Sequence, residues 1–204
     1  MDKLKALAVI FACAQEYQNN LAGRNLLFLC TNKHKKIFSV EVTFDASNFL
    51  HMTGLKVDKS NLSALEFYHK CLDRRLKVSE FEFADDGTTP LKLRILPGLV
   101  RKNLSAKMIG DYNMSKPKLY TDKIAGGIKA CIGFVQHKGY GRYIPNTVLE
   151  GDIRLKTIHA DRIIVTYRKY RNEAKYTEIV YAAKGVEWDT LELSEEYQYL
   201  TLPK

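Results

Sequence analysis

The chain opens with apolar residues spaced three or four positions apart, which is the repeat of a helix with one buried face. Gly23 follows as a stop signal, so the pattern predicts a helix over residues 3–22. Polar residues from Gln15 onward interrupt its most apolar stretch, which favours a soluble helix over a signal peptide or a membrane span. The residues that set the repeat are Leu4, Leu7, Ile10, Phe11, Ala14, Tyr17 and Leu21.

Two strand-like runs come next. Residues 25–31 form an apolar run, residues 32–35 form a polar turn, and residues 37–44 have the character of a returning strand. We therefore predict a hairpin whose tip carries basic side chains.

Residues 48–56, after the hairpin, contain side chains that could take part in acid–base catalysis. Asp45 suits the N-cap of a short helix that carries His51, and Gly54 suits the end of that helix. Such a helix would expose one face with His51, Thr53 and Lys56.

The rest of the chain divides into helices and then strands. A capping box at residues 63–66 opens a helix through about Leu76. Thr89 with Pro90 starts another, which Pro97 kinks or divides. Later runs predict strands over residues 108–112, 118–125, 128–136, 142–146, 162–170 and 175–183.

This order indicates an α+β fold, with N-terminal helices and a hairpin packed on an antiparallel β-sheet. We find no linker rich in Pro, Gly or Ser, no internal repeat and no low-complexity tract. We therefore expect residues 1–204 to form a single domain.

The net charge of +9 changes the picture, because a basic surplus favours an acidic partner. Nucleic acid is the first candidate and an anionic membrane surface or acidic protein the second, while an ordinary solvated surface remains the alternative for any single patch. Strand tyrosines beside basic residues can stack on exposed bases. We expect RNA or another nucleic acid, a possible host or phage protein partner and no membrane. The candidate nucleic-acid-binding residues are Lys33, Lys35, Lys36, Lys116, Lys118, Tyr120, Arg142 and Tyr143.

The four cysteines, Cys13, Cys30, Cys71 and Cys131, are far apart and form no CxxC pair. This favours reduced thiols, a reducing compartment and a cytoplasmic protein, and it argues against a zinc site. The histidines lack metal-ligand spacing, and no phosphate-loop or dinucleotide fingerprint occurs. We expect neither a metal nor a cofactor.

Candidate catalytic residues follow from the chemistry of phosphodiester cleavage, which needs proton transfer and stabilisation of charge on phosphorus. His51 can act as base or acid, and Lys56 and Arg168 as cationic stabilisers. Thr53, Asn146 and Thr147 can donate hydrogen bonds to phosphate oxygens. A structural histidine, a solvated arginine and a capped strand end are the competing interpretations.

Several stretches resemble a family of phage- and Firmicutes-associated proteins classed with the barnase–EndoU–colicin–RelE (BECR) nucleases. The resemblance runs from about residue 25 to residue 188 and leaves out the first helix and the tail. It implies helices on an antiparallel sheet of four or more strands, with RNA cleaved on the open face. The stretches are residues 25–30, 49–54, 108–113, 129–134, 143–147 and 152–154.

The resemblance places family-like positions at His51 and Thr53, at Asn146 and Thr147, and at Arg168. Our leading hypothesis is an RNA-binding protein of phage or mobile-element type that cleaves RNA without metal, with general acid–base chemistry centred on His51. The alternative is a non-catalytic binding or anti-defence protein that engages a nucleic acid or a host protein complex through its basic face. A structural virion or toxin-cargo domain is a third class.

Overall fold

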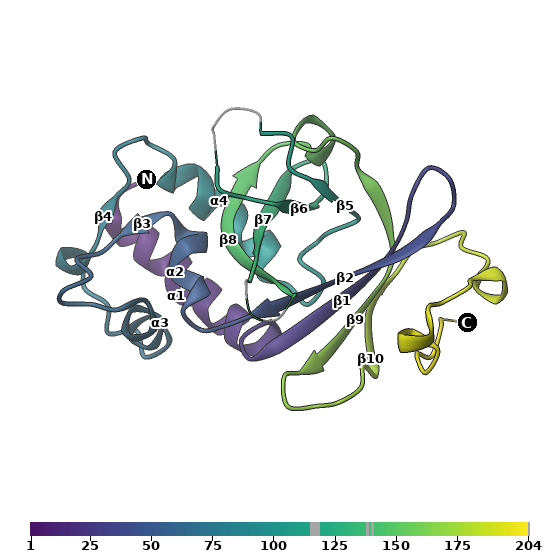
Figure 1. Cartoon of the computed structure of the whole chain (residues 1–204). Coiled ribbons are helices and arrows are strands. Elements are labelled where there is room, and N and C mark those ends of the chain that lie inside the picture. Colours follow the sequence, from purple (N-terminus) through teal and green to yellow (C-terminus); the bar gives the residue numbers. More distant parts are fainter. Residues whose placement is uncertain (115–118, 138, 140, 204) are drawn as a thin grey trace.

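The structure is a computed structural model that describes residues 1–114, 119–137, 139 and 141–203 (Figure 1). Four α-helices and a large mixed sheet of eight strands make it an α+β fold, as the sequence predicted. The helices are α1 (Lys3–Asn20), α2 (Asn48–Thr53), α3 (Ala64–Leu72) and α4 (Thr89–Leu99).

The helix ends follow local capping chemistry. The predicted capping box of α3 is present, because Ser63 and Glu66 satisfy each other's backbone N–H groups. Gly54 ends α2 in the left-handed conformation, at φ 69°. We had predicted Asp45 as the N-cap of α2, and this was wrong. Ser47 takes that position, and its side chain makes no capping hydrogen bond.

Two helices differ from the predicted extent. α3 ends at Leu72 rather than near Leu76, because Arg74 adopts a positive φ of 55° just beyond the cap. α4 is not divided at Pro97 and continues through it to Leu99.

The strands of the large sheet run in the order β1-β2-β8-β7-β6-β5-β9-β10. β9 also pairs with β1, the first strand of the order, so the pairings from β1 to β9 form a closed ring and the sheet curls on itself, with β10 added beside β9 (Figure 1). The pairs are antiparallel except for β2 and β8, which are parallel and meet at Val42 and Tyr143. The strands are β1 (Arg24–Thr31), β2 (Ile37–Phe44), β5 (Met108–Asp111), β6 (Lys123–Gly126), β7 (Ala130–Gln136), β8 (Tyr143–Glu150), β9 (Asp161–Tyr170) and β10 (Glu178–Ala182); β3 (Leu55–Lys56) and β4 (Glu82–Phe83) pair separately.

β8 is longer than predicted and contains Asn146 and Thr147 in its middle rather than at a turn. The register between β7 and β8 shifts at Gly133/Phe134, so that Phe134 pairs with Pro145. A bulge is one of the few places where a sheet tolerates proline, which supplies no N–H to the ladder. Pro145 therefore marks a bulge inside β8 and not the end of the strand.

The main core lies between the helices and one face of the sheet. Alternate residues of β1 and β2, such as Phe28 and Phe44, are buried on this face. Tyr17 of α1 contacts the rings of Phe44 and Phe49 at centroid distances of 6.2 and 5.3 Å. Such aromatic packing buries a large apolar area and fixes the helices against the sheet.

The opposite face of β1 and β9 has its own apolar cluster, which the C-terminal tail covers. We define the tail as residues 186–203, and Figure 1 shows it beyond β9 and β10. Trp188, Leu191 and Tyr197 of the tail pack with Leu27 and Leu29 of β1. Farther along this face, alternation in β2 presents Glu41 and Thr43 beyond the apolar cluster.

Arg168 of β9 connects three elements. Its side chain is 9% exposed and binds both carboxylate oxygens of Glu178 on β10, at 2.7 and 2.8 Å. Nη1 donates to the carbonyl oxygen of Asn20, at the end of α1, at 2.9 Å. Burial acts to raise the pKa of Glu178, but the hydrogen bond and charge of Arg168 outweigh it and hold that pKa below its ordinary value of 4.5.

We predict that Glu178→Gln destabilises the fold at pH 7 by about 1–2 kcal/mol, because the buried Arg168 loses its charged partner; the partial exposure of Glu178 keeps the effect small. Since the folded-state pKa of Glu178 is lowered, its stabilisation exists above pH 4.5 and disappears as the pH falls through that lowered pKa. Urea unfolding of both proteins from pH 3 to pH 7 measures the difference. A gap that stays constant over this range contradicts the prediction. Glu82→Gln, which removes an exposed partner of Lys3, is the control and should change little.

Candidate active site

A cleft opens where β2 and β8 separate beyond their single pairing. Its cavity of about 250 Å³ is lined by side chains from β2 and β8, the turn after β7 and the turn after β9. These residues are Thr43, Asp45, His137, Arg142, Ile144 and Arg171.

Glu41 orients Arg142 at one side of the cleft. Its Oε2 accepts a hydrogen bond from Nε of Arg142 at 2.9 Å. Its other oxygen accepts bonds from Nδ2 of Asn25, at 3.2 Å, and from the hydroxyl of Tyr176. Burial, and then the bond to Glu41, raise the pKa of Tyr176 well above its ordinary value, so this phenol stays a donor.

Asp45 orients Arg171 at the other side. Its carboxylate accepts a bond from Nη2 of Arg171 at 2.5 Å. The backbone of Asp45 is fixed as well, because its N–H donates to Asn48 and its carbonyl accepts from the hydroxyl of Tyr17, each at 2.8 Å. The carboxylate is therefore held at the cleft although it lies beyond the end of β2.

His137 lies at the rim, on the turn between β7 and β8. Its backbone N–H donates to the carbonyl of Arg142 at 2.8 Å, and its exposed ring accepts from the N–H of Gly139 at Nδ1, at 3.2 Å. In the neutral ring the proton is then on Nε2. The cleft thus brings together an imidazole, a carboxylate and two guanidinium groups.

His51 lies elsewhere, exposed near the end of α2. Partial burial lowers its pKa below the ordinary value of 6.5, and the charges of Lys59 and Lys92 lower it further. Lys92 crosses the end of α2 so closely that a Cβ at Gly54 would lie 2.5 Å from its Cδ. These effects favour the neutral imidazole of His51, and the ammonium groups of Lys59 and Lys92 lie close enough to act on it.

The predicted neighbours of His51 have other partners. Thr53 is buried, contrary to the expected exposed face, and its hydroxyl donates to Leu50 and accepts from the N–H of Leu55, at 2.7 and 3.2 Å. Lys56 is exposed and paired with Asp85.

β8 packs against α2, but Asn146 and Thr147, the two hydrogen-bond donors predicted on β8, do not point to a site with His51. Asn146 donates to the carbonyl of Tyr120 and accepts from the hydroxyl of Thr121. The hydroxyl of Thr147 is buried and has no hydrogen-bond partner among the described residues. With Arg168 bound to Glu178, the six predicted catalytic residues do not form one group.

The predicted nucleic-acid-binding residues lie in separate places. Lys33, Lys35 and Lys36 are exposed at the tip of the β1–β2 hairpin, and Arg142 lines the cleft. The ring of Tyr143 lies under Nζ of Lys123, at 5.7 Å from the centroid, and Tyr120 is 79% exposed. Lys116 and Lys118 lie outside the described residues.

Sequence reasoning missed Glu41, Asp45, His137 and Arg171 as site residues. The signal for Glu41 was present, because alternation along β2 opposes Glu41 and Thr43 to the apolar residues that face the helices. The other three lie on turns, and only the tertiary fold brings those turns together.

Helices on one face of a curled sheet, with a polar cleft on the other, define the chain as a small α+β protein. The chain belongs to the family described as phage-Barnase-EndoU-ColicinE5/D-RelE like nuclease 4 (PBECR4), whose model matches residues 9–185. The match reaches into α1, farther than the resemblance in the sequence had indicated. It supports a nuclease-type function in general and an interaction with nucleic acid. No curated protein and no solved structure matches the chain.

Two further findings concern the described part of the chain. No helix there is long and apolar enough to cross a membrane. No group of three or more His, Cys, Asp or Glu side chains there is arranged to hold a metal ion.

We predict that Lys92→Gln raises the pKa of His51, because it removes a positive charge that disfavours the imidazolium. Lys59→Gln should act in the same direction. NMR titration of the His51 ring in each variant measures the change. Lys129→Gln, at an exposed position on the β6–β7 turn, is the control. An unchanged or lower His51 pKa in both lysine variants would contradict this electrostatic account.

Proposed function

We propose that the chain binds RNA and cleaves its backbone in the cleft by acid–base chemistry that needs no metal ion. The observation that carries the proposal is the set of Asp45, His137, Arg142 and Arg171 around one cavity. These are the group types that phosphodiester cleavage requires: two proton carriers and fixed positive charge.

The proposed reaction begins at the ribose. Asp45 takes the proton of the 2′-hydroxyl, and the 2′-oxygen attacks the adjacent phosphorus. For the second transfer His137 must be protonated on both ring nitrogens, which releases the bond from the Gly139 N–H to Nδ1. This imidazolium gives its Nε2 proton to the departing 5′-oxygen as the P–O bond breaks, and it becomes a neutral imidazole. The products are a 2′,3′-cyclic phosphate and a new 5′-hydroxyl, so the substrate is RNA rather than DNA.

Arg142 and Arg171 stabilise the charge that develops on the phosphate oxygens. A guanidinium is suited to this because it presents several donors in a plane and stays charged. Each is already oriented by a carboxylate, at 2.9 Å for Arg142 and 2.5 Å for Arg171. Glu41 acts through Arg142 and is therefore a positioning residue.

The second candidate centre is His51, as the sequence hypothesis had it. The lowered pKa favours it, because a neutral imidazole can accept a proton at pH 7. Lys59 and Lys92 supply positive charge for a phosphate. In contrast to the cleft, the two charged groups that act on His51 are both ammonium groups, with no carboxylate among them.

We predict that His137→Ala and Asp45→Asn each lower kcat about 10²- to 10⁴-fold, which is the usual contribution of a general acid or base. His51→Ala should leave kcat nearly unchanged. Cleavage of a mixed RNA pool in EDTA, with binding and melting temperature recorded for each variant, compares the two centres. An RNA with a single 2′-deoxyribose at the cleaved position should resist cleavage.

Loss of cleavage in His51→Ala alone, with binding and melting temperature unchanged, transfers the chemistry to α2. Wild-type protein that binds RNA but cleaves none under any condition supports the alternative of a non-catalytic binding or anti-defence protein. A steep loss of that binding with salt would show that phosphate contacts dominate it.

We also predict that Glu41→Gln and Arg142→Gln reduce kcat/KM by similar factors and that the double variant is hardly worse than either. Residues that act as a unit show such coupling, of about 0.5–3 kcal/mol. Steady-state kinetics of the wild type, the two single variants and the double variant gives the kcat/KM values from which the coupling of the two residues is calculated. If Glu41→Gln has its full effect in the Arg142→Gln background, Glu41 does not act through Arg142.

A further inference from the structure

A second group of cations lies at the far end of the same hairpin. A cavity of about 540 Å³ at the hairpin tip is lined by Lys33, His34, His159 and Arg162, among others. A neighbouring cavity of about 640 Å³ shares Arg162 with it. Its other basic lining residues are Lys35 and Lys36.

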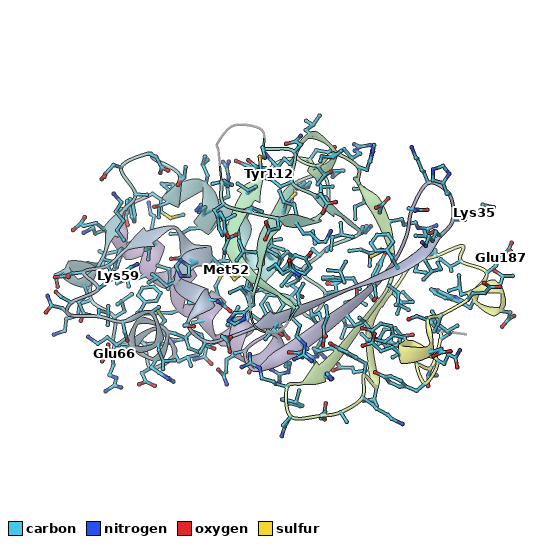
Figure 2. The ribbon with its side chains drawn as sticks, viewed as in Figure 1. Lys35, Met52, Lys59, Glu66, Tyr112 and Glu187 are labelled. Carbon is cyan, nitrogen blue, oxygen red and sulfur yellow. The ribbon has the colours of Figure 1, made fainter. Side chains whose placement is uncertain are left out.

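The tail forms the other wall of the second cavity. Residues 186–187 and 190–192 of the tail line it, together with Gly185 just before the tail. In Figure 2, Lys35 on the hairpin and Glu187 on the tail lie at the same end of the molecule. The gap between them is therefore a groove with a basic wall and a mixed wall.

The lysines and the arginine of these two cavities have no ion-pair partner in the described part of the chain. Lys33, Lys35, Lys36 and Arg162 form no ion pair within the described part of the chain, although Asp161, Glu187 and Glu192 line the same cavities. In the cleft, by contrast, both arginines are paired. The groove is lined by three cations, Lys35, Lys36 and Arg162, and by two carboxylates, Glu187 and Glu192. The small surplus of unpaired positive charge around open space favours binding of an anion.

The groove and the cleft share one face of the sheet. Ile37 lines the groove and Thr43 lines the cleft, and odd-numbered residues of β2 project from the same side. Six residues of extended strand separate them, so the two sites are roughly 20 Å apart. The tail packs on this face between the two sites, so a strand of nucleic acid that reaches both must be long enough to pass over the tail.

We propose that the groove between the hairpin tip and the tail is a distal subsite for the phosphate backbone of single-stranded RNA. Lys35, Lys36 and Arg162 bind phosphates there while a distant phosphate of the same strand lies in the cleft. This inference rests on the proposed function of the cleft, and it adds that the substrate is an RNA longer than the few nucleotides that the cleft holds. The family match ends at residue 185, so the wall that the tail supplies lies beyond the matched region.

The test uses Lys35→Gln/Lys36→Gln, with Lys107→Gln/Lys129→Gln as a control that removes the same charge at exposed positions near β5, β6 and β7. Fluorescence anisotropy gives the Kd of each protein for a trinucleotide and for an uncleavable 2′-O-methyl RNA of about twelve nucleotides at several salt concentrations. The hairpin variant should bind the long RNA about tenfold more weakly and lose about one unit of salt slope per lysine. Its Kd for the trinucleotide, and both values for the control, should change little.

Equal weakening for both lengths, an equal effect of the control, or no effect on the long RNA overturns the subsite. Arg162→Gln is the second variant; its melting temperature is compared first, because Nη2 of Arg162 donates to the carbonyl of Lys184 at 2.5 Å. The assay measures binding, so a protein that cleaves nothing but shows the length effect retains the subsite and loses only the proposed reaction. A protein that cleaves RNA but binds long and short RNA with the same loss in the hairpin variant retains the proposed reaction and loses the subsite.

Discussion

The arrangement depends on β1, whose two faces belong to two different apolar clusters. Leu26 and Phe28 alternate with Leu27 and Leu29, so one set packs against the helices and the other against the tail. β1 also pairs with β2 on one side and β9 on the other, which closes the sheet. A one-residue slip of this strand would exchange both sets of side chains, so its register is strongly determined.

That register determines where the polar chemistry lies. β2 follows the alternation of β1, and Glu41 projects on the side away from the helices, where Arg142, Asn25 and Tyr176 bind it. At one end of this face lies the cleft, whose two arginines are paired with carboxylates. At the other end lies the groove, whose cations are unpaired. Fixed ion pairs suit precise stabilisation of a reacting phosphate, whereas exposed unpaired lysines suit looser contacts to a backbone.

Local signals predicted much of the fold, since the helical repeat of α1, the hairpin of β1 and β2 and the capping box at Ser63 depend on neighbouring residues. The parallel meeting of Val42 and Tyr143 and the bulge beside Pro145 depend on residues distant in sequence, and so escaped prediction. The site was harder. His51 was a local motif, whereas the cleft requires three turns to converge, and no spacing along the chain records this.

The central claim is that a phosphate of RNA lies in the cleft. NMR mapping of amide shifts with an uncleavable 2′-deoxy dinucleotide tests this most directly, because it locates binding without depending on activity. If a phosphate lies in the cleft, the largest shifts occur at Asp45, Arg142 and Arg171. Shifts confined to His51, Lys59 and Lys92 would contradict it and place the phosphate at the end of α2.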